Sequence, residues 1–213
     1  MATMIAVITT DANIKPHLLQ RALNEAVEDT FNMITVDNEM STNDCVFVLA
    51  NGISSKITDG QKYNAFVLGL KKICEHLARE IVRDGEGANK LITIIVEGAF
   101  TKEDARSVAK SIAGSNLLKC AVFGADPNVG RVLSAAGNSR AKIEQDKIDV
   151  YLNDIMLVKK GNAVSFNLSK ASQKMKEKEV FFTVNLNLGK YSATAWGCDM
   201  TEGYIEINAK YHT

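Results

Sequence analysis

The sequence has few residues of the kinds that build metal sites, disulfide frameworks and flexible linkers. It contains 4 cysteines, 3 histidines and 2 prolines in 213 residues. No Cys-x-x-Cys pair occurs, which argues against a zinc knuckle or a disulfide framework. His-x-x-x-His and Glu-x-x-His pairs are also missing, so we expect no metal site. Each cysteine is expected to be a small buried hydrophobe in a reducing compartment.

An excess of charge and long apolar runs are absent too. Lys and Arg total 25, as do Asp and Glu, so the formal charge is zero and no basic field attracts nucleic acid or an anionic membrane. Apolar runs such as Leu91–Val96 span about six residues, against the roughly 18 that a membrane-spanning helix needs. No cationic N-terminal region precedes an apolar stretch, so no secretory signal is predicted. We therefore expect a soluble, cytoplasmic protein with neither nucleic acid nor membrane as a partner.

Hydrophobic periodicity predicts alternating strands and helices in the first two-thirds of the chain. Strand-like apolar runs cover residues 3–9, 33–36, 45–49, 91–96 and 117–123. Helical spacing of apolar residues covers 14–27, 63–82, 101–112 and about 127–137. Thr101 and Asp104 have the spacing of a helix cap.

After about residue 146 the apolar period changes from helical to two, which predicts mostly antiparallel strands. The strand-like runs cover 148–153, 155–158, 164–166, 180–188, 192–196 and 204–208. The charged stretch 170–178 is compatible with a short helix. Since no Pro- or Ser-rich linker occurs, residues 1–213 are predicted to form a single unit, with an α/β part (1–145) and a β-rich part (146–213). The predicted fold class is α+β.

Composition and periodicity alone identify no activity, because no Walker loop, Gly-x-Gly-x-x-Gly motif or Ser/His/Asp signature occurs. A series of short motifs in a fixed order is more specific. The motifs are Met1-Ala-Thr-Met4, Ile8-Thr-Thr-Asp-Ala12, Ser41-Thr-Asn-Asp44, Leu49-Ala-Asn-Gly52, Asp84-Gly-Glu-Gly-Ala88, Gly124-Ala-Asp-Pro-Asn128, Gly130-Arg131, Trp196-Gly-Cys-Asp199 and Ile207-Asn-Ala-Lys-Tyr-His-Thr213. Together they resemble the β chain of the ornithine acetyltransferase family, the bifunctional glutamate N-acetyltransferases of arginine biosynthesis. The resemblance covers essentially the whole chain and implies that family's N-terminal-nucleophile type of fold.

The resemblance implies that a precursor cuts itself between Ala2 and Thr3 and leaves Thr3 as an N-terminal nucleophile. A hydroxyl is a poor nucleophile at neutral pH, and a free α-amine with a pKa of about 7.7 to 8.0 is a suitable proton acceptor for it. Thr3 would take the acetyl group of N-acetylornithine as an ester and pass it to glutamate. By residue type alone, Thr3 would only be a β-branched residue starting a strand. Because Met1 and Ala2 precede it here, we expect a chain that retains both to be inactive.

Three further residues match substrate-binding positions of the family, namely Glu86, Asn208 and Thr213. A carboxylate at Glu86 suits the ammonium group of an amino-acid ligand. Without the resemblance, Glu86 would be a solvated turn residue, Asn208 a surface residue and Thr213 a disordered terminus. A tail that enters the active site would explain why residues 204–211 alternate like an ordered strand.

Several other matching segments are interpreted as structural. Asp126–Asn128 and Gly130–Arg131 predict a capped turn before a helix, with an anion site at the helix N-terminus as the alternative. Asn43 and Asp44 are expected to order the loop near the nucleophile, and a direct role for them is left open. The chain departs from the family pattern at Val129 (usually Trp), Asn89 (usually Thr) and Asn38-Glu39-Met40 (commonly Gly-Asp-Thr).

The resemblance also implies a partner, an α chain from the same precursor, in an α2β2 heterotetramer. That chain would carry the oxyanion donors and a substrate-binding lysine. No cofactor is expected, and acetyl-CoA stays open as a second acetyl donor. Two alternatives remain: a related N-terminal-nucleophile aminopeptidase or amidohydrolase, in which water takes the acyl group, and an inactive structural fragment that lacks its α chain.

Overall fold

The structure, a computed structural model, describes residues 3–210 and divides into two compact units. The first unit comprises Met1–Asn32 and Glu39–Ile81, and the second comprises Met33–Asn38 and Val82–Thr213. The change of apolar period near residue 146 lies inside the second unit. The division of residues 1–213 as one unit into an α/β part (1–145) and a β-rich part (146–213) stays a prediction.

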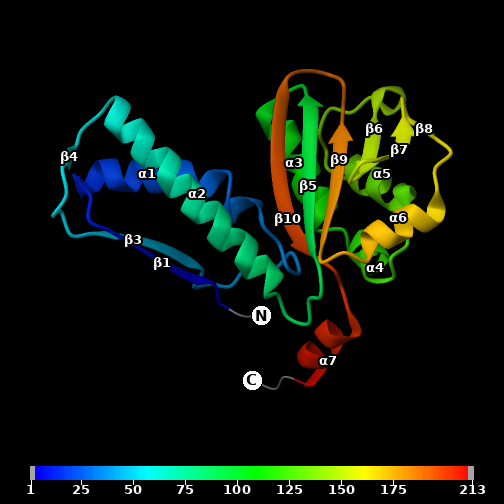
Figure 1. Cartoon of the computed structure of the whole chain (residues 1–213), viewed down its shortest axis with the longest axis horizontal. Coiled ribbons are helices and arrows are strands. Elements are labelled where there is room, and N and C mark those ends of the chain that lie inside the picture. Colours follow the sequence, from blue (N-terminus) through cyan, green and yellow to red (C-terminus); the bar gives the residue numbers. More distant parts are fainter. Residues whose placement is uncertain (1–2, 211–213) are drawn as a thin grey trace. The chain divides into compact units, whose positions relative to one another are not determined.

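Two short parallel sheets and two helices build the first unit (Figure 1). Its elements are β1 (Ile5–Thr10), β2 (Asn13–Ile14), α1 (Pro16–Glu28), β3 (Cys45–Ala50), β4 (Lys56–Ile57) and α2 (Gln61–Arg83), whose last two residues belong to the second unit. β1 pairs in parallel with β3, and β2 pairs in parallel with β4. Figure 1 shows α1 and α2 on the same side of the β1–β3 pair.

The helices of this unit form where the apolar spacing predicts them. Pro16 stands in the first turn of α1, where its missing N–H costs nothing, and Leu18, Ala22 and Ala26 bury one stripe of the helix. α2 buries a similar stripe. Tyr63 at its start contacts α1, because the Tyr63 hydroxyl accepts a hydrogen bond from an α1 arginine and donates one to an α1 glutamate.

The second unit contains a six-stranded mixed sheet with helices (Figure 1). Its elements are β5 (Leu91–Ala99), α3 (Lys102–Ala113), α4 (Asn116–Phe123), α5 (Val129–Gly137), β6 (Asp149–Leu152), β7 (Ile155–Lys159), β8 (Asn162–Ala163), α6 (Leu168–Met175), β9 (Glu179–Asn185), β10 (Tyr191–Cys198) and α7 (Glu202–Lys210). The strand order is β10-β5-β9-β6-β7-β8, with β5 and β9 parallel and every other pair antiparallel. Helices combined with this mixed sheet confirm the α+β class.

The core of the second unit lies around β5. This strand is apolar and buried along most of its length, which is typical of a strand covered on both faces. α3 packs on β5 and β10, and α5 packs on α3. α3 begins at the predicted cap, where the Thr101 hydroxyl accepts a hydrogen bond from the Asp104 amide at 3.0 Å.

Four segments predicted as strands have other structures. In the segment 33–36, Met33 ends a 3-10 turn (Phe31–Met33) and Ile34 forms an isolated bridge with Trp196. Residues 164–166 lie just beyond the two-residue strand β8. Residues 117–123 and 204–208 are helical, in α4 and α7.

The two helical corrections have local causes. A short apolar run such as 117–123 fits a buried strand or a buried helix equally well by periodicity. The helix forms because Ser115 caps it, accepting a hydrogen bond from the Leu118 amide, and because Leu118 and Val122 bury one helical face. In α7 the isoleucines that suggested a strand face, Ile205 and Ile207, are exposed. The prediction of an ordered terminal strand was wrong.

Candidate active site

Thr3 is exposed and lies two residues before the start of β1 in the first unit. The residue after it is held by Asp44, whose Oδ1 accepts a hydrogen bond from the Met4 amide at 2.9 Å. The Ser41 hydroxyl donates to the same Oδ1 at 2.6 Å. These contacts, the Ser41 hydroxyl first, hold the pKa of the Asp44 carboxyl below its ordinary value of 3.8. Asp44 therefore fixes the backbone beside Thr3, as its place in the sequence had suggested.

Glu86 and Asn208 lie together in the second unit. Asn208 Nδ2 donates to Glu86 Oε2 at 2.8 Å, although 122 positions separate the two residues in the sequence. The same Nδ2 donates to the Tyr204 carbonyl at 3.0 Å, within α7. Glu86 is half-buried and Asn208 is exposed, so both side chains are accessible to a ligand. Two of the predicted substrate-binding residues are thus neighbours, whereas Thr3 belongs to the other unit.

The loop that carries Glu86 is shaped by the glycines on either side of it. Gly87, and not Gly85, adopts the left-handed conformation, with φ of 68°. A Cβ atom on Gly87 would stand 2.7 Å from the Gly203 carbonyl carbon, so only glycine fits against the start of α7. A Cβ on Gly85 would stand 3.2 Å from the side chain of Val36.

Hydrogen bonds attach α7 to this loop through residues that the sequence did not mark as functional. The Thr201 hydroxyl donates to the Gly87 carbonyl at 2.6 Å and accepts from the Tyr204 amide at 3.3 Å. The Tyr204 hydroxyl donates to Asp37 Oδ2 at 3.2 Å. Thr201 lies two residues after the matching motif Trp196–Asp199, and Gly87 belongs to the matching motif Asp84–Ala88, so these two motifs are the sequence signals nearest to the contacts.

Asp199 anchors the far end of the same loop. Its Oδ1 accepts hydrogen bonds from the amides of Asn89 at 2.8 Å and Lys90 at 2.9 Å. Asp199 is buried, and among the described residues its Oδ2 has no hydrogen-bond partner. Burial lowers the pKa of the nearby Lys90, and the negative charge of Asp199 opposes that shift. The Lys90 ammonium donates at 2.6 Å to the Val122 carbonyl near the end of α4.

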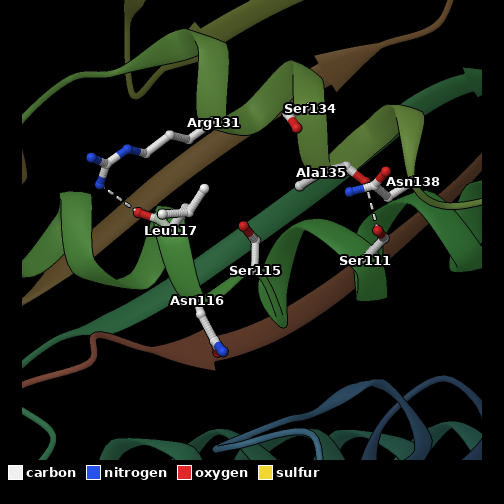
Figure 2. Close-up of a pocket in the computed structure, with 8 residues that line it drawn as sticks. All are labelled: Ser111, Ser115, Asn116, Leu117, Arg131, Ser134, Ala135 and Asn138. Atoms are coloured by element: carbon white, nitrogen blue, oxygen red, sulfur yellow. Dashed lines mark hydrogen bonds between the residues drawn. The ribbon is translucent and has the colours of Figure 1, made fainter.

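The segment around Arg131 lies apart from these residues. Asn128 precedes α5 but makes no side-chain cap, and donates instead to Asp126 at 3.3 Å, so the predicted capping bond is not formed. Arg131 donates to the Leu117 carbonyl at 2.7 Å. A pocket of about 260 Å³ lies at this segment. Figure 2 shows the residues that line it, namely Ser111, Ser115, Asn116, Leu117, Arg131, Ser134, Ala135 and Asn138. Thr3, Glu86 and Asn208 do not line this pocket.

Other parts of the predicted site lie outside the described residues, namely Ala2 of the cleavage site and Thr213 of the tail. Within residues 3–210, no group of three His, Cys, Asp or Glu side chains is arranged to hold a metal ion. No helix in this same range is both long and apolar enough to cross a membrane.

The model of the ArgJ family matches residues 1–213. The chain belongs to the ArgJ family. This membership confirms the family that the ordered motifs had indicated. A crystal structure of the arginine biosynthesis bifunctional protein ArgJ from Bacillus halodurans is 42% identical, covers 98% of this chain and 100% of that chain, and superposes with a TM-score of 0.95.

Two ArgJ relatives are similar over the whole of this chain. The arginine biosynthesis bifunctional protein ArgJ of Symbiobacterium thermophilum is 49% identical, and that of Dehalococcoides mccartyi is 47% identical. The chain spans about half the length of these curated relatives, 54% and 53% respectively. The names of these ArgJ proteins place them in arginine biosynthesis.

Proposed function

We propose that this chain is the nucleophile-bearing half of an acetyltransferase that moves the acetyl group from N2-acetyl-L-ornithine to L-glutamate. The observation that carries the proposal is the contact between Glu86 and Asn208. A carboxylate and an amide together suit an α-amino acid, because the carboxylate accepts hydrogen bonds from an ammonium and the amide has both donors and an acceptor. Membership of a family whose members are named for arginine biosynthesis supports these substrates and a cytoplasmic enzyme.

The proposed chemistry begins after the bond between Ala2 and Thr3 has been cut. The freed α-amine takes the proton of the Thr3 hydroxyl, and Oγ1 attacks the acetyl carbonyl carbon. The carbon–nitrogen bond then breaks, and ornithine leaves with that proton. The amine of glutamate attacks the resulting ester, the bond between the acetyl carbon and Oγ1 breaks, and the proton lost by the attacking amine passes through the α-amine of Thr3 to Oγ1. Acetyl passes between two amines without a change of oxidation state, so no cofactor is required, and acetyl-CoA is a possible second donor.

The proposal includes a partner, the other half of the full-length protein, as an α chain in an α2β2 heterotetramer. The surface that fits it is the outer face of the β1–β3 pair. Val7 and Phe47 are aligned partners in the two strands and are 56% and 49% exposed, with Ile5 and Leu49 exposed beside them. Ala6 and Ile8 of β1 are buried on the opposite face.

This outer face has the properties of an incomplete sheet. Parallel strands normally occur with both faces covered, and an open strand edge is a template for further pairing. Within residues 3–210, β1 and β3 pair only with each other. Relatives of almost twice this length contain a further polypeptide long enough to cover the face and extend the sheet. We therefore assign the face to the α chain.

Charged substitutions test this docking surface. Val7→Glu or Phe47→Glu, made in the full-length protein, is expected to abolish co-purification of the two halves after cleavage. Leu168→Glu is the control, because Leu168 in α6 is 64% exposed in the second unit. Retained association in both test variants would contradict the assignment. A concentration-dependent homodimer that these substitutions disrupt would assign the face to a second copy instead.

Intact mass spectrometry tests the acetyl-threonine intermediate. The co-produced halves, incubated with N-acetylornithine and no glutamate, should give one acetyl group on this chain, and glutamate should remove it as N-acetylglutamate. Thr3→Ala should abolish the adduct, whereas Thr58→Ala, at another exposed threonine of the first unit, should retain it. Absence of the adduct under slow turnover would exclude the covalent route.

The same assay separates the alternatives. Steady acetate release that does not depend on glutamate would indicate an N-terminal-nucleophile hydrolase. Unchanged activity of the Thr3→Ala complex would indicate that this chain is only structural. Adduct formation with acetyl-CoA would identify the second donor. A sample whose mass retains Met1 and Ala2 is expected to be inactive.

A further inference from the structure

The Glu86 loop and α7 are joined by one buried residue, Thr201. Its hydroxyl donates to the Gly87 carbonyl at 2.6 Å, next to Glu86 in the sequence, and accepts from the Tyr204 amide at 3.3 Å in the first turn of α7. Asn208 lies one turn further along α7. One hydroxyl therefore touches both segments whose side chains meet at the Glu86–Asn208 contact.

Further contacts fix the ends of this arrangement. Asp199, two residues before Thr201, holds the amides of Asn89 and Lys90 at the end of the Glu86 loop. The Tyr204 hydroxyl is attached to Asp37. The connection from β10 to α7 thus determines the position of the loop on one side and of the helix on the other.

We propose that Thr201 is a positioning residue that holds Glu86 and Asn208 at the separation required to bind one substrate group together. The inference rests on the proposed function, because it takes Glu86 and Asn208 as substrate contacts. Both side chains are accessible, so their backbones must be held by neighbours if they are to be preorganised for a ligand. Thr201 acts through them and does not itself touch the substrate.

A pair of identical substitutions tests the proposal. Thr201→Val removes a hydroxyl with two partners and keeps the shape of the side chain. Thr93→Val, in β5, is the matched control, since Thr93 and Thr201 are both 5% exposed and the Thr93 hydroxyl has no partner among the described residues. In the full-length cleaved enzyme, Thr201→Val should raise KM for the acetylated amino acid about tenfold with little change in kcat. Thr93→Val should leave both values unchanged, and Thr201→Ser should restore KM.

A double-mutant cycle separates positioning from a general effect on stability. If Thr201 acts through Glu86, Thr201→Val should add little to the KM of Glu86→Gln. Fully additive effects, or equal effects of Thr201→Val and Thr93→Val, would overturn the proposal. If Thr201→Val gives no folded enzyme, Tyr204→Phe tests the helix side of the arrangement, with a rise in KM expected and an unchanged KM counting against it.

Hydrogen exchange distinguishes failure of this inference from failure of the proposed function. Thr201→Val should speed amide exchange in both the loop 85–90 and α7, and Thr93→Val should speed neither. An unchanged KM in Glu86→Gln would remove Glu86 from substrate binding and overturn the inference together with that part of the proposed function. A normal effect of Glu86→Gln combined with unchanged exchange in Thr201→Val would overturn only the positioning role.

Discussion

At the residue scale, hydrogen bonds hold the Asp44 carboxylate next to the start of β1. Asp44 accepts from the Met4 amide and from the Ser41 hydroxyl, which places a carboxylate beside the proposed nucleophile. Because these donors favour the charged form, they lower the pKa of Asp44. The folded state therefore binds this proton more weakly than the unfolded state does. The stabilisation from these contacts is fully present above about pH 4 and is lost as pH falls through the lower pKa of the folded state.

A carboxyl titration by NMR checks the cause of this shift. Ser41→Ala removes the largest contribution, so the pKa of Asp44 is expected to move upward toward 3.8. Asp44→Asn mimics the protonated acid, and its loss of melting temperature relative to wild type should shrink as pH falls below about 4. A lower pKa in Ser41→Ala, or a stability difference that does not change with pH, would contradict this account.

Contrary to the expectation from the sequence, the cysteines are not all buried, and we expect their reactivity to follow their burial. Burial raises the pKa of Cys74 to about 11 and also raises the pKa of Cys198, whereas Cys120 is exposed. At pH 8 roughly one Cys74 side chain in a thousand is a thiolate. Maleimide labelling of the native protein, followed by peptide mapping, should modify Cys120 first and reach Cys74 and Cys198 only after denaturation. Faster labelling of Cys74 than of Cys120 would show that the first unit opens readily.

At the scale of elements, α7 shows how a helix brings distant residues together. It carries Asn208 to Glu86, and its own exposed isoleucines contribute little burial. Attachment by Thr201 and Tyr204 therefore defines its position more than hydrophobic packing does.

A proline inside α7 tests whether helical structure is needed for the site. Glu206→Pro removes an intrahelical hydrogen bond and costs about 3 kcal/mol of helix stability, so KM should rise about tenfold or more. Glu206→Ala is the control, because it removes only an exposed ion pair with Lys210 that stabilises little. Equal KM values in the two variants would show that residues 202–210 bind substrate without being helical.

At the scale of the whole molecule, the two units have unequal cores. Buried residues of the first unit include many alanines, such as Ala22 and Ala26. The core of the second unit is a larger, continuous cluster that contains many Leu, Ile and Val side chains. Since stabilisation grows with the apolar area removed from water, the first unit is the less stable part of this chain by itself. The exposed outer face of the β1–β3 pair is consistent with this difference in stability, because a partner that covered it would bury further apolar surface of the first unit.

Hydrogen exchange on the chain with and without the proposed α chain checks whether the first unit is the less stable one. In the chain alone, amides of β1 and α1 should exchange faster than those of β5 and β9. Addition of the proposed α chain should slow amide exchange in the first unit more than in the second. Similar protection of both units in the chain alone, or slowing confined to the second unit, would contradict the assignment of the docking face.

The sequence by itself determined the family, the α+β class and the long helices, because ordered motifs and a repeated apolar stripe are local signals. It also marked Glu86 and Asn208. Only the tertiary structure decided that residues 117–123 and 204–208 are helical, since short apolar runs have no distinct period. It also decided that Glu86 and Asn208 meet and that Thr201 joins their segments. Those hydrogen bonds connect residues more than 100 positions apart, and such pairings arise from the packing of the folded chain, which no local pattern encodes.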